Sequence, residues 1–310
     1  MDAHAVVINQ PKEITLTKLR IDDLGVDDVA VEMEYSGIST GTEKLIWSGT
    51  MPQFPGMGYP LVPGYESVGK VIAVGSNVTL PIGQRVFVPG AKCYGEVKGL
   101  FGGASSHVVL PQQRLTLLDD DLGQEGILLA LAATAYHVTH GIPEQQPDLI
   151  IGHGVVGRLL ARIAVAKGKT PVVWETNPIR MQGAMGYSVI DPKDDDQKSY
   201  GIICDASGDE SLMNTLVSKL KPQGEIVLAG FYDQPISFLF APAFMREMKL
   251  RIAAQWQPKD LEEVHQMISL KQLPLGGLIT HNSAPQDADT AYKTAFGDMH
   301  CLKMILNWRQ

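Results

Sequence analysis

The sequence predicts an α/β protein of two domains, in which a β-rich domain precedes a doubly wound parallel sheet. Residues 1–120 contain short β-branched runs separated by glycine and proline turns, as expected of antiparallel strands. From Asp119 onward apolar runs alternate with helical patterns, which is typical of parallel strands joined by helices. Between Leu149 and Glu175 an apolar run, a glycine-rich turn, a helical pattern, a second apolar run and an acidic residue follow one another.

The length of the chain, 310 residues, is sufficient for two hydrophobic cores. The tail from Leu275 to Gln310 does not continue the alternation, so we expect it to return to the first domain. The predicted β-rich domain therefore comprises residues 1–120 and 270–310, and the predicted domain with the parallel sheet comprises residues 121–269.

Composition excludes several classes of protein. Hydrophobic residues make up 45% of the chain and charged residues 19%, which argues against disorder, and the net charge of -8 argues against a nucleic-acid partner. The three cysteines, Cys93, Cys204 and Cys301, are too far apart for a C-x-x-C metal site. The beginning of the sequence lacks the pattern of a signal peptide, and no apolar run approaches a membrane span of ~20 residues. We expect a cytoplasmic protein.

The β-rich domain contains four clear strand patterns: Ala5–Ile8, Val29–Met33, Ser67–Val74 and Arg85–Val88. A long loop, Gly49 to Gly64, carries the large apolar residues Met51, Phe54, Met57 and Tyr59. These side chains could form a lid or a surface for an apolar ligand, or they could cap the core of the domain.

The second domain is predicted to contain further strands and helices. The strands are Leu149–Ile151, Val172–Trp174, Gly201–Asp205, Gly224–Gly230 and Leu250–Ala254. The helices are Glu125–Val138, Arg158–Lys167, Asn177–Met185 and Glu210–Leu220.

The glycine-rich turn fits the pattern G-x-G-x-x-G and consists of Gly152, His153, Gly154, Val155, Val156 and Gly157. The first glycine permits a tight turn, the second lets the backbone approach a pyrophosphate, and the third lets the helix pack closely on the strand. Because a predicted strand precedes this motif and a predicted helix follows it, we interpret the turn as a dinucleotide-binding site of the Rossmann type. An ordinary tight turn is the alternative.

The predicted cofactor is NAD. Glu175, at the end of the second strand, is placed to accept hydrogen bonds from a ribose diol and to repel the 2′-phosphate of NADP. Arg180 is an opposing signal, because a nearby arginine can accommodate that phosphate. Ser207 and Gly230 follow later strands, where the nicotinamide half should lie.

The order of these elements resembles the medium-chain dehydrogenase/reductase superfamily over nearly the whole chain. The local motifs that carry the resemblance are Gly37–Glu43, Pro63–Glu66, Val68–Val71, Gly83–Val86, Gly102–Ala104, Lys221–Glu225 and Leu278–His281. The resemblance implies a GroES-like β-rich domain joined to a Rossmann domain. It also implies a homodimer built through the nucleotide domain.

The departures from the superfamily pattern concern its catalytic zinc. Ser39 stands where zinc members usually have a cysteine, and Tyr65 stands where they have a histidine. The third ligand, expected near Leu129 to Ala133, is missing as well. Since zinc prefers thiolate, imidazole or carboxylate ligands, we predict a zinc-free member with no metal.

Within the superfamily, the segment Ser36–Lys44, the residues Gly64–Glu66 and the short chain resemble the dehydrogenases of bacteriochlorophyll biosynthesis. That resemblance implies oxidation of the 3-(1-hydroxyethyl) group of a bacteriochlorophyllide to an acetyl group, with NAD as oxidant. The substrate would be a Mg-tetrapyrrole, whose apolar ring could bring the enzyme into transient contact with a membrane.

Oxidation of an alcohol without a metal requires a side chain that accepts the hydroxyl proton directly or through a relay. The candidate catalytic residues surround the former metal region and are Ser39, Thr42, Glu43, Lys44, Tyr65 and Glu66. Tyr65 could act as a phenolate if a cation such as Lys44 lowered its pKa, or its ring could simply fill space. Glu66 could be a base or could tether the loop, and Glu43 could orient a ligand or lie in solvent.

The histidines are less informative. His137 and His140 close a predicted helix, where a favourable interaction with the helix dipole explains them. His153 is expected to line the cofactor groove.

Two other functions stay open, namely a zinc-free NADPH-dependent quinone or enoyl reductase and a non-catalytic dinucleotide sensor.

Overall fold

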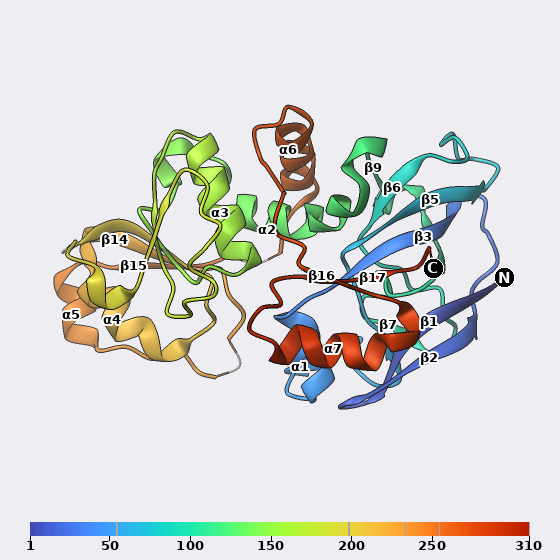
Figure 1. Cartoon of the computed structure of the whole chain (residues 1–310), viewed down its shortest axis with the longest axis horizontal. Coiled ribbons are helices and arrows are strands. Elements are labelled where there is room, and N and C mark those ends of the chain that lie inside the picture. Colours follow the sequence, from blue (N-terminus) through green and yellow to red (C-terminus); the bar gives the residue numbers. More distant parts are fainter. Residues whose placement is uncertain (54, 198, 233, 254, 310) are drawn as a thin grey trace. The chain divides into compact units, whose positions relative to one another are not determined.

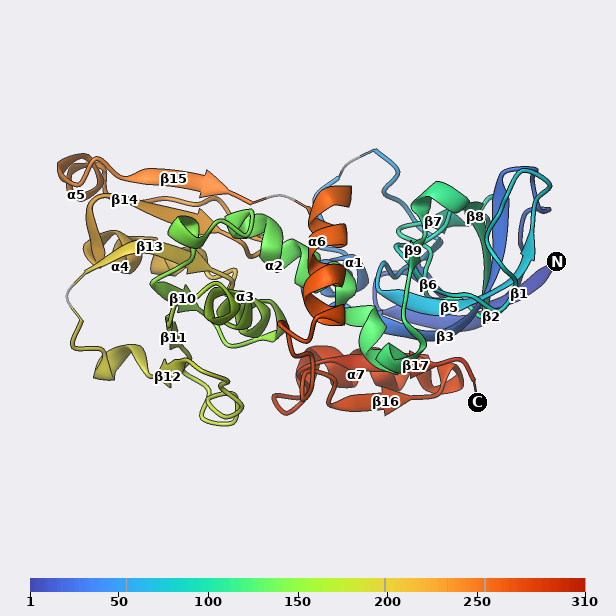
Figure 2. The same ribbon diagram turned by 90° about the horizontal axis from the view of Figure 1, so that it is seen from above.

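The computed structural model describes residues 1–53, 55–197, 199–232, 234–253 and 255–309. The chain divides into two compact units (Figures 1 and 2). The first unit comprises Met1–Ala130 and Gly276–Gln310, and the second comprises Leu131–Leu275. Among the described residues, no helix is both long enough and apolar enough to span a membrane.

The second unit is built around a six-stranded parallel sheet. Its strands are β10 (Leu149–Ile151), β11 (Val172–Trp174), β12 (Ser188–Ile190), β13 (Tyr200–Asp205), β14 (Leu220–Leu228) and β15 (Lys249–Ile252). Their order in the sheet is β12-β11-β10-β13-β14-β15, and every neighbouring pair is parallel. Numbered along the chain this is the Rossmann order 3-2-1-4-5-6, in which the winding reverses beside the first strand. The predicted doubly wound sheet is confirmed.

The helices of the second unit are α2 (Leu129–Thr139), α3 (Val155–Ala166), α4 (Met213–Ser218), α5 (Phe240–Met245) and α6 (Pro258–Ser269). Helix α3 buries Leu159, Leu160 and Ile163, as their spacing predicts. The chain leaves this helix at Gly168, whose φ of +82° favours glycine. The sequence reading missed α6, a helix with a proline in its first turn and a capping box formed by Gln257 and Asp260.

The helix predicted over Asn177–Met185 is wrong. The segment forms a turn and irregular structure before β12. Two interactions explain this outcome. The guanidinium of Arg158 donates hydrogen bonds to the carbonyls of Arg180 and Gln182 at 3.0 and 2.7 Å, so those carbonyls are bound from outside the segment. Gly183 then takes a φ of +86°, which is outside the helical region.

The first unit contains two sheets. One has the order β2-β1-β4-β7, and the other has the order β16-β17-β3-β5-β6-β9 with β8 paired to β3. Its strands are β1 (Asp2–Gln10), β2 (Glu13–Arg20), β3 (Asp28–Ile38), β4 (Leu61–Val62), β5 (Ser67–Val74), β6 (Arg85–Val88), β7 (Lys98–Gly99), β8 (His107–Pro111), β9 (Thr116–Leu117), β16 (His281–Ser283) and β17 (Met304–Asn307). Its helices are α1 (Thr42–Ser48) and α7 (Ala288–Gly297). Short 3-10 helices in the chain are Gln112–Arg114, Asp120–Leu128, Pro143–Gln145, Pro192–Asp194, Glu210–Leu212 and Pro285–Asp287.

The C-terminal tail completes the larger sheet of the first unit. Strand β17 pairs antiparallel with β3, so that Met304 lies opposite Ile38 and Ile305 lies opposite Gly37. Helix α7 packs near α1 through Trp47 and Phe296, whose ring centroids are 5.4 Å apart (Figure 1). The tail therefore brings late residues of the chain beside the motif that follows β3.

The loop between α1 and β4 packs onto the core of the first unit. Met51 is buried together with Ile8, Ile46, Leu61 and Leu100, and Met57 and Tyr59 pack against this cluster. The hydroxyl of Tyr59 also donates a hydrogen bond to the carbonyl of Ile46. Phe54 lies outside the described residues. These contacts support the interpretation of the loop as a cap on the core.

Candidate active site and dinucleotide-binding turn

The glycine turn follows β10 and has three positions with different steric demands. Gly152 has a φ of +90°, which favours glycine. A β-carbon on Gly157 would come within 1.9 Å of the Gly152 carbonyl oxygen, so helix and turn can approach only if this residue is glycine. A β-carbon on Gly154 would meet no atom within 4 Å among the described residues. The space beside Gly154 is therefore open to a ligand.

The first turn of α3 is a suitable place for a pyrophosphate. The helix begins at Val155. Its N-cap residue is Gly154, which has no side chain that could accept a hydrogen bond from the first N–H groups of the helix. Such N–H groups and the helix dipole together favour an anion. The open space at Gly154 and this uncapped helix end fit the diphosphate of a dinucleotide.

Glu175 lies at the end of β11, beside the glycine turn. One of its carboxylate oxygens accepts a hydrogen bond from the backbone N–H of His153 at 3.0 Å, and the other accepts from the N–H of Asn177 at 2.8 Å. These bonds hold the carboxylate in place. Each oxygen keeps a further lone pair, and the side chain is half-buried, so it can still accept a ribose hydroxyl.

The prediction that the side chain of His153 lines the cofactor groove is wrong, because the residue is completely buried. Its Nδ1 donates to the carbonyl of Arg180 at 2.6 Å, and its Nε2 accepts from the hydroxyl of Tyr187 at 2.8 Å. Burial is the main cause that lowers the pKa of His153 to about 4, so the ring is neutral. The neutral ring therefore joins the carbonyl of Arg180 to the hydroxyl of Tyr187.

Arg158 was missed by the sequence reading, although it lies in α3 directly after the glycine motif. Its Nε donates to the carbonyl of His153 at 3.0 Å, and its Nη2 donates to the carbonyl of Arg180. The residue is buried, and this burial lowers the pKa of its guanidinium. Arg158 therefore joins the glycine turn to the segment after Glu175.

The ends of β13 and β14 meet at the buried carboxylate of Asp205. The N–H and the hydroxyl of Ser207 donate to one oxygen at 2.8 and 2.6 Å, and the hydroxyl of Tyr232 donates to the other at 2.8 Å. Burial raises the pKa of Asp205. The backbone N–H of Gly230 donates to the carbonyl of Asp205, and a β-carbon on Gly230 would come within 2.7 Å of Gly208. Both Ser207 and Gly230 thus lie at the carboxyl edge of the sheet.

A polar cluster in the first unit gathers most of the predicted catalytic residues. The hydroxyls of Ser39 and Tyr65 are 2.7 Å apart and form a hydrogen bond, and Ser39 and Thr42 both act to lower the pKa of the phenol. The ring of Tyr65 packs edge-on against Phe101 with a centroid separation of 5.3 Å. Burial, followed by the charge of Glu66, holds the pKa of Tyr65 far above its usual range. Tyr65 is therefore a neutral phenol at physiological pH.

The structure does not support activation of Tyr65 by Lys44, because Lys44 is exposed on α1. The charges that act on the phenol are those of Glu66 and Glu43, and both raise its pKa. The phenolate that the sequence reading considered would need a neighbouring cation to lower the pKa, so this interpretation is wrong.

Glu66 is completely buried and forms an ion pair with Lys303 at 2.7 Å. The ammonium of Lys303 also donates to the carbonyl of Ile38 at 3.1 Å. The second oxygen of Glu66, Oε1, is buried without a hydrogen-bond partner in the part of the chain that is described. A β-carbon on Gly37 would come within 2.6 Å of Glu66 Oε2, so glycine is required for this close approach.

Glu43, in the first turn of α1, is also completely buried. It accepts hydrogen bonds from the hydroxyl of Tyr292 at 2.7 Å and from the N–H of Ser39 at 3.2 Å. Burial is the main cause that raises the pKa of Glu43 to about 8, and the negative charge of Glu66 acts in the same direction. The prediction that it could be a solvated surface residue is wrong.

Lys303 and Tyr292 were missed by the sequence reading. Each belongs to the C-terminal tail, more than 200 positions from its partner, and neither lies in a recognisable motif. The available signal was the expected return of the tail to the first domain. That expectation alone does not identify which side chain meets which carboxylate.

Ser39 and Tyr65 offer a hydroxyl and a phenol, and the two carboxylates of the cluster are bound by Lys303 and Tyr292. Among the described residues, one group of three histidine, cysteine or carboxylate side chains could hold a metal ion, and it consists of His137, His140 and Asp260. None of these was among the predicted site residues. Zinc prefers such donors over a serine and a phenol.

Comparison with known proteins agrees with this geometry. Residues 25–120 match the family model "Alcohol dehydrogenase GroES-like domain". The chain is 53% identical to a 2-desacetyl-2-hydroxyethyl bacteriochlorophyllide A dehydrogenase of Rhodobacter capsulatus over 100% of this chain and 99% of the relative. It is 50% identical to the enzyme of the same name from Cereibacter sphaeroides, again over 100% and 99%.

The chain belongs to the family of these dehydrogenases. The predicted resemblance to the medium-chain superfamily and to the enzymes of bacteriochlorophyll biosynthesis is thus confirmed.

Solved structures share the fold. L-idonate 5-dehydrogenase from Escherichia coli has a TM-score of 0.86 at 18% identity and covers 99% of this chain and 98% of its own. The 2R,3R-butanediol dehydrogenase from Bacillus subtilis has a TM-score of 0.85 at 19% identity, with coverage of 98% and 99%.

Proposed function

We propose that the protein oxidises the 3-(1-hydroxyethyl) group of a bacteriochlorophyllide to an acetyl group, with NAD as the oxidant. Support for the substrate comes from the two relatives that are at least half identical over the full length and are named for a hydroxyethyl bacteriochlorophyllide. The glycine turn supports a dinucleotide, because it leaves space beside Gly154 next to an uncapped helix end.

We propose NAD over NADP because of Glu175. Its carboxylate is held beside the turn by two backbone N–H groups, where it would repel a 2′-phosphate. The carbonyl of Arg180 is bound by His153 and Arg158, and these bonds hold the backbone that follows Glu175 in place. NAD, when bound, supplies the acceptor for the hydride that leaves the alcohol carbon.

The loss of the hydroxyl proton is assigned to the polar cluster of the first unit, without a zinc ion. A phenol with a raised pKa does not persist as a phenolate at neutral pH. It can still donate its own proton to a base and accept another proton in the same step. Tyr65 therefore passes the proton as a relay together with Ser39, its hydrogen-bond partner. The carboxylates whose charges act on Tyr65, Glu66 and Glu43, are the candidate final acceptors. Thr42 orients the phenol.

Among the described residues, no donor occupies the lone pairs of Glu66 Oε1, and this favours Glu66 as the acceptor because the oxygen is free to take a proton. Glu43 has a pKa of about 8 and so holds a proton below that pH, which means that it can accept the substrate proton only after losing its own. Lys44 is exposed and takes no part in this proposal.

The test is an absorbance assay of the purified protein with a 3-(1-hydroxyethyl) bacteriochlorophyllide and either NAD or NADP. We expect a red shift of the chlorin band, because a new carbonyl extends the conjugation, and NADH should appear in equal amount. A reaction with NADP alone would contradict the cofactor. Binding of NAD without turnover of any hydroxyethyl chlorin would favour a non-catalytic sensor, and NADPH-dependent reduction of quinones would favour a reductase.

A homodimer is a further part of the proposal, and β15 supports it. This strand lies at the end of the parallel sheet, and edge strands that are not covered tend to pair with another chain. Large apolar side chains are exposed beside it, with Phe240, Met245 and Ile252 each more than 70% exposed. We expect light scattering to give the mass of two chains, and Ile252→Lys to give the mass of one.

A further inference from the structure

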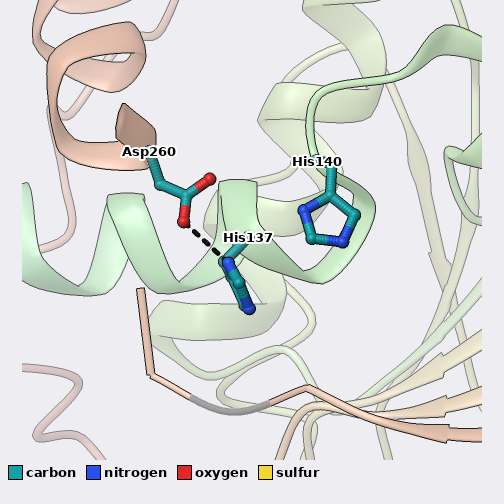
Figure 3. A group of neighbouring side chains, drawn as sticks. All are labelled: His137, His140 and Asp260. Carbon is teal, nitrogen blue, oxygen red and sulfur yellow. Dashed lines mark hydrogen bonds and ion pairs between the residues drawn. The ribbon is translucent and has the colours of Figure 1, made fainter. Parts of the chain in front are cut away.

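Two histidines come together where helix α2 ends. His137 lies in its last turn, and His140 follows the helix directly. The backbone of His140 has a φ of +49°, a conformation that is uncommon for residues other than glycine. This turn brings the two rings into edge-to-face contact, with a centroid separation of 5.0 Å (Figure 3).

Asp260, in the first turn of α6, points its carboxylate toward His137 (Figure 3). Its Oδ2 accepts from the Nδ1 of His137 at 2.7 Å and from the backbone N–H of Gln257 at 2.7 Å. The second bond belongs to the capping box of α6, so the carboxylate is held in position by its own helix. All three residues lie in the second unit.

These side chains form a set of metal donors. One ligand atom from each of His137, His140 and Asp260 lies within 4.8 Å of the other two. Bonds of about 2.0–2.2 Å to zinc place ligands of a tetrahedral site roughly 3.3 Å apart, so small side-chain rotations are sufficient. Imidazole and carboxylate ligands suit zinc, nickel and copper, whereas magnesium and calcium prefer oxygen donors alone.

The three residues are buried to different degrees, as expected of a site that an ion can enter from solvent. The side chains of His137 and Asp260 are mostly buried, at 16% and 10% exposure, whereas His140 is exposed. A hydrogen bond between His137 and Asp260 explains only those two residues. It does not involve His140, whose left-handed backbone at the end of α2 brings a third donor to the same place.

We propose that His137, His140 and Asp260 form a binding site for a divalent transition-metal ion of the zinc class, with water as the fourth ligand. The ion would cross-link α2 to α6 within the second unit. Its role would be structural or regulatory, because the proposed proton relay uses other residues. The proposal is independent of the substrate and of the cofactor preference.

In the part of the chain that the structure describes, no second group of three histidine, cysteine or carboxylate side chains competes for the ion. The cysteines Cys93, Cys204 and Cys301 are all buried, so thiols do not offer an alternative surface site for added zinc. A metal that binds the folded state and not the unfolded state stabilises the protein. Zinc should therefore raise the temperature of unfolding.

The test is calorimetric titration of the untagged full-length protein, freed of metal with a chelator, with zinc chloride alone. We expect one equivalent to bind. His140→Asn should reduce the affinity at least tenfold, because asparagine tolerates the left-handed backbone but offers no imidazole. Asp260→Asn should also reduce the affinity, while its amide oxygen still accepts the capping hydrogen bond. His300→Asn, at an exposed histidine in the first unit, is the matched control and should bind as the unchanged protein does.

Two further measurements separate a built site from casual binding. Cobalt(II) should give visible absorption bands of a tetrahedral complex with the unchanged protein and not with His140→Asn. Zinc should raise the unfolding temperature of the unchanged protein and of His300→Asn, but not that of His140→Asn. The absence of zinc binding, or equal binding by His140→Asn or Asp260→Asn and the unchanged protein, would overturn the proposal.

Discussion

The two functional regions of the molecule are constructed in opposite ways. The glycine turn and its flanking elements, from Gly152 to Glu175, are a single stretch of chain, and the dinucleotide binding proposed for it would depend on backbone N–H groups and open space. The polar cluster of the first unit combines Glu43 and Glu66 with Tyr292 and Lys303 from the tail. A local motif can be recognised in a sequence, whereas a cluster of this kind exists only after folding.

The two regions also differ in what stabilises them. At Gly157 the glycine turn has no room for a side chain, so an added methyl group would collide with the backbone. The polar cluster buries two carboxylates, and the free-energy cost of removing each carboxylate from water must be offset by a partner or by protonation. Glu66 receives it from the cation Lys303, while Glu43 is bound by neutral donors and has its pKa raised to about 8. Substitutions in the polar cluster should therefore act through lost charge interactions, and substitutions in the glycine turn should act through steric collisions.

The largest effect is expected for Lys303→Met, which leaves the carboxylate of Glu66 buried without a cation. Breaking a buried pair in this way costs about 3–5 kcal/mol in the free energy of unfolding, measured by urea denaturation. Lys293→Met is the control, because its pair with Asp289 is exposed and should contribute at most about 1 kcal/mol. Equal effects of the two substitutions would contradict the importance of the buried pair.

Tyr65→Phe should lower kcat about a hundredfold or more, which is typical for the loss of a proton-transfer group. The free energy of unfolding should change little, because the ring can keep its contact with Phe101. The measurement is steady-state kinetics with the chlorin and NAD. Tyr59→Phe, whose hydroxyl binds the carbonyl of Ile46, should retain kcat. A Tyr65→Phe enzyme with unchanged kcat would remove Tyr65 from the relay.

Substitution of the glycines should separate shape from binding. Gly157→Ala puts a methyl group 1.9 Å from the Gly152 carbonyl oxygen and should destabilise the protein by about 1–3 kcal/mol, measured by thermal unfolding. Gly154→Ala points a methyl group into open space, so it should leave stability unchanged and weaken NAD binding in a titration. If Gly154→Ala bound NAD normally, the pyrophosphate would have to lie elsewhere.

The smallest effect concerns Glu43 and the pH dependence of stability. Its pKa is about 8 in the folded protein and 4.5 in the unfolded chain, so between these values the folded state holds a proton that the unfolded state has lost. Stability therefore falls as the pH rises through this window. From about pH 6 to about pH 8 the unchanged protein should lose about 2 kcal/mol more than Glu43→Gln. Urea unfolding at both pH values measures this difference.

Glu262→Gln, at an exposed position of α6, is the control for that experiment and should follow the unchanged protein. A Glu43→Gln protein with the same pH dependence as the unchanged protein would show that Glu43 does not retain its proton. The buried carboxylate would then have to be compensated by charge, as Glu66 is.

The sequence predicted the parallel sheet and its glycine turn because each part is local. The apolar run Leu149–Ile151 and the periodicity of α3 both appear in the structure where the patterns place them. The same reasoning failed for Asn177–Met185, where Arg158 binds the carbonyls that a helix would need. It also missed α6, and with it the donor set of His137, His140 and Asp260.

By itself, the sequence determined the class of fold, the position of the dinucleotide turn and the candidate residues near Ser39 and Tyr65. Short-range sterics and hydrophobic periodicity carry that information, and both act over a few residues. Only the tertiary structure decided that Lys303 compensates Glu66, that Tyr292 binds Glu43 and that His153 is buried and neutral. Those properties depend on burial and on partners distant in the chain, because the energy of a charge is set by its surroundings after folding.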